Sequence, residues 1–172
     1  MSYLCHANRL AVLTNHLILI NMKQRINVLE IGQNAMKSLY PMGAHLTKSP
    51  VGKPLLDLIY MRISQINRCA FCLDMHSKEL RANGETEQRL YTLNAWRDTP
   101  FFSDKERAAL AWAEAVTNCN VPDEIYGETL QHFSEEELVD LTLGVTAINT
   151  YNRINHAFSS VGGDIPGWGV VK

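Results

Sequence analysis

The sequence lacks the features that mark β-proteins, membrane proteins and nucleic-acid-binding proteins. It has no alternating apolar–polar run long enough to build a sheet, and no apolar stretch of the ~20 residues that a membrane-spanning helix requires. It also has no run of lysines and arginines, and its formal net charge is only −2. This charge gives no long-range attraction to nucleic acid or to an anionic membrane. We therefore expect an all-α protein with neither kind of partner.

Cysteine is scarce, and its distribution excludes a disulfide framework. Of the four cysteines (Cys5, Cys69, Cys72 and Cys119) only Cys69 and Cys72 are close in sequence. Small secreted proteins that depend on disulfides carry several spaced pairs instead. We therefore expect a cytoplasmic protein in which the Cys-x-x-Cys motif is redox-active or binds a metal, and structural roles for Cys5 and Cys119.

The first 21 residues differ from the rest of the chain. Leu10 to Ile20 is largely apolar, but it is too short to cross a bilayer, and no small-residue cleavage site follows it. We interpret residues 1–21 as an N-terminal extension that is disordered or belongs to a subunit interface. Residues 22–172 are expected to form a single helical domain with a C-terminal arm, since residues 159–172 are rich in glycine.

Helical periodicity and capping signals divide this domain into segments. Residues 26–40 have helical spacing, and Pro41 is expected to end that helix. Long apolar patterns predict helices over about 53–67 and 138–158, and either could be a central core helix or pack against another subunit. Ser103 and Ser134 each begin a capping box with a glutamate three residues later. The other predicted helices cover about 69–83, 86–96, 108–118 and 123–133.

The segment from Asp57 to His76 concentrates the residues that could carry chemistry. Cys69 and Cys72 are three residues apart, and His76 follows four residues after Cys72. No glycine or proline interrupts residues 69–76, so we expect a helix with both sulfurs and the imidazole on one face. A thiol, with a pKa of about 8.5, becomes a nucleophile as the thiolate. The helix N-terminus and His76 would both favour that thiolate.

Two further residues complete the candidate site. Asp57 precedes Cys69 by twelve residues and could orient His76 if the two helices pack antiparallel. Gln65 could donate a hydrogen bond in the same pocket. Zinc is the main chemical alternative, because two thiolates and an imidazole are also zinc ligands. No second Cys-x-x-Cys motif is present, so Asp57 or a water would have to complete the tetrahedron.

Residues 62–79, which include Cys-Ala-Phe-Cys-Leu-Asp-Met-His, resemble the core motif of the alkylhydroperoxidase AhpD-like, carboxymuconolactone decarboxylase superfamily. Residues 102–114 and 145–155 are also similar to that superfamily, and the resemblance covers about 27–158. It implies an all-helical subunit that forms trimers or hexamers and reduces hydroperoxides with a cysteine pair, without a cofactor. The disulfide that results would be reduced again by an external dithiol protein.

The resemblance also implies a role for each site residue. Cys72 would attack a small hydroperoxide, Cys69 would resolve the product as a disulfide, and His76 would accept the proton of Cys72. Asp57 stands where the family usually has a glutamate. Phe71 stands where the peroxidase members have a relay histidine, so this chain lacks one proton carrier. The alternatives are a redox sensor or disulfide oxidoreductase and, less favoured because decarboxylase members generally lack the cysteine pair, a lactone decarboxylase.

Overall fold

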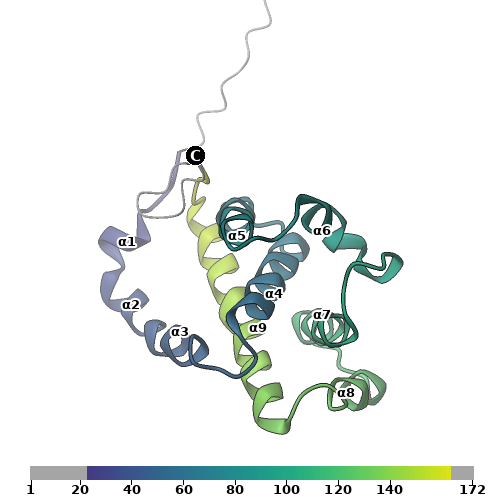
Figure 1. Ribbon diagram of the computed structural model, residues 1–172. Coiled ribbons are helices and arrows are strands. Elements are labelled where there is room, and N and C mark those ends of the chain that lie inside the picture. The colour runs from purple at the N-terminus through teal and green to yellow at the C-terminus, as the bar shows by residue number, and fades with distance from the viewer. Residues whose placement is uncertain (1–22, 164–172) are drawn as a thin grey trace, which may run out of the picture.

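Helices account for all the regular secondary structure in residues 23–163, which are the residues that the computed structural model describes (Figure 1). This confirms the expected all-α fold. The predictions for residues 1–21 and 164–172 lie outside the described residues. The elements in chain order are α1 (Val28–Ile31), α2 (Gln33–Lys37), α3 (Tyr40–Leu46), α4 (Lys53–Ile66), α5 (Ala70–Ala82), α6 (Glu87–Thr92), the 3-10 helix η1 (Leu93–Asp98), α7 (Asp104–Thr117), α8 (Asp123–Thr129) and α9 (Glu135–Phe158).

The two long apolar helices, α4 and α9, pack against each other at the centre of the subunit (Figure 1). Ile59 and Ile63 of α4 and Leu141 and Val145 of α9 are completely buried. Burial of each such side chain contributes about 1.5–3 kcal/mol. Gly144 allows close contact, because a Cβ there would lie only 2.9 Å from a methyl group of Leu56. Intramolecular packing therefore accounts for much of the apolar character of both helices.

Both predicted capping boxes are confirmed. The Ser103 hydroxyl accepts a hydrogen bond from the Glu106 backbone N–H, and the Glu106 carboxylate accepts one from the Ser103 backbone. Ser134 and Glu137 repeat this exchange at the start of α9. Each box satisfies backbone donors that have no partner within the helix, so it determines where the helix begins.

The prediction that Pro41 ends a helix is wrong. Pro41 lies in the first turn of α3, where its missing N–H removes no hydrogen bond from the helix. Residues 26–40 form two short helices that meet at Gly32 instead of one long helix. The predicted helix over 86–96 also changes form, because it ends at Thr92 and the chain continues as η1.

Residues 28–46, called here the α1–α3 segment, lie to one side of α4 and α9 (Figure 1). Hydrogen bonds from Arg25 and His45 connect this side of the molecule to α9. The Arg25 backbone N–H donates to the Phe158 carbonyl at 2.9 Å, and His45 Nε2 lies 2.6 Å from Asp140 Oδ1. Most side chains of the α1–α3 segment are not buried in the core. Within this segment only Met36 and Leu46 are buried.

None of the helices in the described part of the chain is both long and apolar enough to cross a membrane.

A Glu114→Gln variant is expected to lose about 2–3 kcal/mol of unfolding free energy at neutral pH. Glu114 Oε1 accepts hydrogen bonds from Arg62 Nε at 2.7 Å and Trp96 Nε1 at 2.9 Å, and its other oxygen pairs with Arg97 at 2.6 Å. It therefore connects α4, η1 and α7. Removing its charge would leave the Arg62 side chain, which is only 15% exposed, without a counter-ion.

Urea unfolding of wild type and variant checks this prediction, with Glu124→Gln as an exposed control. Burial alone would raise the pKa of Glu114, but the hydrogen bonds from Trp96, Arg97 and Arg62 outweigh burial and hold it below 4.5. A depressed pKa stabilises the fold above the unfolded value, and this contribution is lost as the pH falls through the folded value. The difference between wild type and variant should therefore shrink in acid. Equal stabilities at pH 7 would contradict the prediction.

Candidate active site

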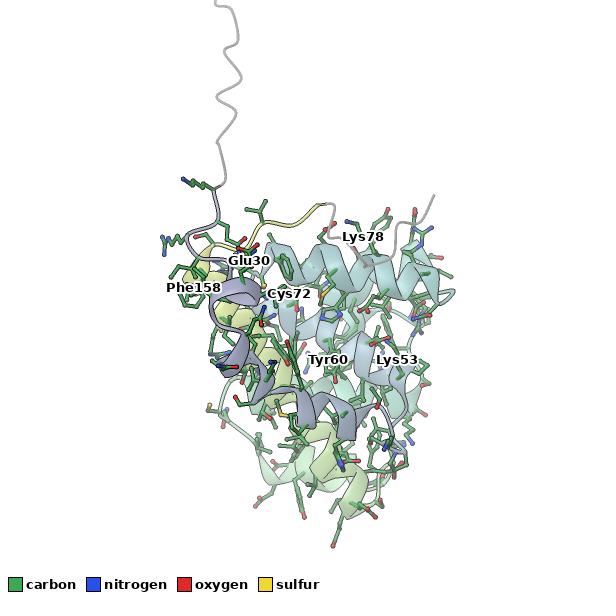
Figure 2. All side chains as sticks on the ribbon, turned by 90° about the vertical axis from the view of Figure 1, so that its left-hand side faces the viewer. Glu30, Lys53, Tyr60, Cys72, Lys78 and Phe158 are labelled. Atoms are coloured by element: carbon green, nitrogen blue, oxygen red, sulfur yellow. The ribbon has the colours of Figure 1, made fainter. Side chains whose placement is uncertain are left out.

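A cavity of about 670 Å³ lies between the α1–α3 segment and helices α4, α5 and α9. In Figure 2, which faces the α1–α3 segment, the labelled side chains Cys72, Tyr60 and Lys53 belong to the helices behind it. The wall is mainly apolar and includes Met36, Leu46, Leu56, Met75, Ala147 and Ile148. Its charged side chains, Lys53, Asp57 and Glu79, come from α4 and α5. The size and character of this cavity suit a small organic molecule.

The turn between α4 and α5 positions the cysteine pair. Arg68 has a left-handed φ of 56°, and the Cys69 backbone N–H donates to the Ser64 carbonyl at 3.0 Å. Cys69 is consequently the N-cap of α5 with an extended backbone (φ −84°, ψ 94°), and Cys72 lies in the first turn. The prediction that Cys69 lies within the helix is therefore wrong, because the turn that follows α4 extends to Cys69 and α5 begins only at Ala70. Both cysteines are free thiols.

The two sulfurs differ in their access to the cavity. Cys69 and Cys72 are 2% and 1% exposed, so neither is accessible from the outer surface. Cys72 lines the cavity, whereas Cys69 is not among the lining residues. A small molecule inside the cavity would therefore meet Cys72 first, with Cys69 behind it.

The two thiols titrate as a pair. The pKa of Cys69 is lowered to about 7, because the thiol of Cys72 and then its backbone N–H stabilise the Cys69 thiolate against the cost of burial. The pKa of Cys72 is raised, first by Cys69 and then by burial. A negative charge on one sulfur disfavours a second charge beside it. The pair therefore carries one negative charge from about neutral pH.

His76 lies on the same helix as Cys72 and also lines the cavity. Its Nδ1 lies 3.2 Å from Glu79 Oε2, and the hydrogen bond from His76 lowers the pKa of Glu79. An ionised Glu79 accepts, so in the neutral imidazole Nδ1 carries the proton and Nε2 is an acceptor. Nε2 is buried without a hydrogen-bond partner in the described structure.

The expectation that both sulfurs lie close to the imidazole needs correction. Among the described residues, no hydrogen bond joins His76 to Cys69 or Cys72. The reason is that Cys69 lies before the first helical residue, outside the i, i+3, i+4 pattern that the prediction assumed. Cys72 and His76 keep that spacing. They face the same cavity, which leaves room for a ligand or a water between them.

Asp57 lies beside this group but does not hold the imidazole. Its carboxylate is 3% exposed and accepts a hydrogen bond from Lys53 Nζ at 2.5 Å. Burial raises the pKa of Asp57, Lys53 partly offsets this, and the nearby Glu79 raises it further. The expected contact between Asp57 and His76 is therefore not formed. The imidazole of His76 instead pairs with Glu79, one turn later on the same helix, and Asp57 pairs with Lys53.

The structure places Gln65 outside this group. Gln65 Oε1 accepts a hydrogen bond from Arg62 at 3.3 Å, and Arg62 in turn binds Glu114 of α7. Gln65 does not line the cavity, since eight residues of helix turn it about 80° away from Asp57. Phe71, by contrast, lines the cavity.

Sequence reasoning missed three contacts of the site. The contact between Glu79 and His76 could have been predicted, because Glu79 follows His76 by three residues on a predicted helix. Lys53 could likewise have been paired with Asp57 four residues later. Asn155 could not be found in this way, because its Nδ2 donates to Cys72 Sγ at 3.3 Å across 83 residues of sequence.

Residues 23–163 contain no group of three or more His, Cys, Asp and Glu side chains arranged to bind a metal ion together. The zinc alternative thus finds no ligand set in this part of the chain. The geometry instead combines a thiol pair, an unpartnered imidazole nitrogen and an apolar cavity.

Comparisons with known proteins identify the family to which this chain belongs. The model of the carboxymuconolactone decarboxylase family matches residues 35–115. The uncharacterized protein YdfG of Bacillus subtilis (strain 168) is 42% identical over 142 residues, which are 81% of this chain and 97% of YdfG. The uncharacterized protein YnjA of Escherichia coli (strain K12) is 33% identical over 127 residues, or 73% and 67% of the two chains.

A solved structure is similar to this chain in both sequence and fold. The crystal structure of a protein of unknown function from Agrobacterium tumefaciens, provisionally assigned as an antioxidant defence protein AhpD, superimposes with a TM-score of 0.79. It is 38% identical and covers 83% of this chain and 100% of that chain. The chain thus belongs to the AhpD-like, carboxymuconolactone decarboxylase superfamily.

Proposed function

We propose that this protein is a thiol-dependent hydroperoxide reductase in which Cys72 attacks the peroxide and Cys69 resolves the product. The observation that carries the proposal is the position of the Cys72 thiol. It lines an organic-sized cavity together with the unpartnered Nε2 of His76, and a second thiol lies behind it. The assignment of the Agrobacterium tumefaciens relative to antioxidant defence supports the same reaction class.

The chemistry needs only the groups in the site and a dithiol. The thiolate of Cys72 attacks the terminal oxygen of the hydroperoxide, the O–O bond breaks, and the alkoxide that leaves takes a proton to become an alcohol. Cys72 is then a sulfenic acid. Cys69 attacks the Cys72 sulfur, the S–O bond breaks, and water leaves as the disulfide forms. An external dithiol reduces this disulfide and is oxidised in turn.

His76 is suited to carry the proton. With Glu79 on Nδ1, the lone pair of Nε2 faces a cavity that Cys72 also lines. Nε2 can accept the proton of the Cys72 thiol, directly or through a water, which leaves the thiolate to attack the terminal oxygen of a hydroperoxide. His76 then gives this proton to the departing alkoxide, and the terminal O–H stays on Cys72 as the sulfenic acid. Because Phe71 supplies no proton carrier, we assign this route to His76.

We also propose that the chain works as a homo-oligomer, a trimer or a hexamer, with a cytoplasmic dithiol protein as its reductant. Leu29 and Ile31 of α1 are 59% and 80% exposed, which supports a contact between subunits on this side. Both sulfurs are buried, so reduction requires a slender dithiol or an opening of the cavity.

The size of the cavity predicts a preference for organic hydroperoxides. A cavity of about 670 Å³ far exceeds the volume of hydrogen peroxide, and its wall is mainly apolar. Burying roughly 60 Å² of a phenyl group contributes about 1.5 kcal/mol. This free energy corresponds to a roughly tenfold increase in kcat/KM. We therefore expect cumene hydroperoxide to be reduced with a kcat/KM at least about tenfold above that of hydrogen peroxide.

Consumption of both peroxides with dithiothreitol as reductant tests the proposal, with a Cys69→Ser/Cys72→Ser double variant as the control. Turnover by wild type alone supports a peroxidase. Formation of one disulfide per chain without further turnover would favour the redox sensor. If the double variant consumes peroxide as fast as wild type, the proposed function is wrong.

A further inference from the structure

A chain of side-chain amides lies behind the cysteine pair. Asn67, which follows α4, donates through Nδ2 to Asn149 Oδ1 at 2.9 Å and to Asn152 Oδ1 at 2.8 Å. Asn152 is completely buried and donates to Ser64 Oγ at 3.1 Å. One turn further along α9, Asn155 Nδ2 donates to Cys72 Sγ at 3.3 Å.

This network fixes the direction in which the Asn152 amide points. Its oxygen accepts from Asn67, so its NH₂ group faces Ser64 and the sulfurs. The same amide stabilises the thiolate forms of both Cys69 and Cys72. Asn155 differs, because its donor reaches only Cys72 and because Asn155 itself lines the cavity.

The charge on the pair has to move before a peroxide can be attacked. The thiol and the backbone N–H of Cys72 favour the negative charge on Cys69, which does not line the cavity. The attacking sulfur has to be Cys72. A donor placed at Cys72 Sγ alone stabilises the charge on the sulfur that faces the cavity.

We propose that the Asn155 amide selects Cys72 as the attacking sulfur by donating a hydrogen bond to its thiolate, while Asn152 stabilises the charge on either sulfur. Asn155 is then a catalytic residue, since it touches the reacting atom. This inference rests on the proposed reaction at Cys72. It concerns the thiol pair itself, however, and can be tested without any peroxide.

The experiment measures alkylation of each cysteine by iodoacetamide as a function of pH, with the labelled site identified by mass spectrometry. In wild type we expect Cys72 to be labelled before Cys69. Asn155→Leu should raise the apparent pKa of Cys72 labelling by about one unit and slow labelling at pH 7 roughly tenfold. Asn155→Asp, which keeps the shape but replaces the donor with a carboxylate, should slow it further.

Thr146→Val is the matched control, because it removes a polar group from the exposed face of the same helix. It should label like wild type. Circular dichroism and thermal unfolding show whether each variant is folded. If Asn155→Leu does not fold, the labelling of Asn155→Asp tests the inference instead. Unchanged pKa and unchanged order of labelling in a folded Asn155 variant would overturn the inference. A shifted pKa in a protein that reduces no peroxide would support the inference and defeat only the proposed function.

Discussion

A Cys72→Ser variant is expected to lose hydroperoxide reduction by at least about a thousandfold, because Cys72 is the only cysteine among the described residues that lines the cavity. A serine hydroxyl at this position is not ionised at neutral pH and cannot form the sulfenic acid. The expected result is therefore no oxidation of the chain by one equivalent of cumene hydroperoxide. Peroxide consumption and the intact mass of the protein measure the two effects.

Cys69→Ser separates the two thiols. Cys72 still faces the cavity in this variant, so we expect one equivalent of peroxide to react and the mass to rise by one oxygen atom, followed by a stall. Without Cys69 the sulfenic acid has no resolving thiol and is open to further oxidation. Cys119→Ser removes an exposed thiol and should behave as wild type. The assigned roles would be reversed if Cys69→Ser failed to react while Cys72→Ser still took up oxygen.

A His76→Gln variant is expected to reduce organic hydroperoxide roughly a hundredfold more slowly than wild type, within the range that general acid–base groups contribute. The reason is that His76 Nε2 is the buried acceptor on the cavity wall that has no other partner. Stopped-flow oxidation of the thiol pair measures the chemical step directly. Wild-type rates should rise with pH through about 7, where the pair acquires its charge.

Two neighbouring carboxylates test how His76 is held. Glu79→Gln should slow the reaction by about tenfold, because it weakens the partner of Nδ1. Asp57→Asn should have a smaller effect, since Asp57 is occupied by Lys53. His132→Gln, which is remote from the cavity lining, is the control. A larger loss in Asp57→Asn than in Glu79→Gln would show that Asp57, and not Glu79, orients the imidazole during the reaction.

The sequence predicted the helices well where local chemistry decides them. The Ser103 and Ser134 capping boxes and the apolar patterns of α4 and α9 were sufficient, because they act within one or two turns. Prediction failed at Pro41, since a proline that ends one helix and a proline in the first turn of the next look alike in sequence. Between these cases the α1–α3 segment has short helices with weak signals.

The sequence likewise predicted only those features of the site that depend on spacing within one helix. The spacing of Cys69, Cys72 and His76 identified the thiol pair and placed Cys72 and His76 on one helix. It did not show that Cys69 caps that helix, because this depends on the turn at Arg68. It also did not show which carboxylate meets the imidazole.

The sequence by itself determined the all-α class, the superfamily and the thiol pair, because these depend on residue types at fixed spacings along the chain. Only the tertiary structure decided that Cys72 meets a cavity, that Cys69 lies behind it, and that Asn155 reaches the Cys72 sulfur from α9. The physical reason is that access and charge depend on burial and on partners from other helices. Residues as far apart in sequence as Cys72 and Asn155 become neighbours only when α5 packs against α9.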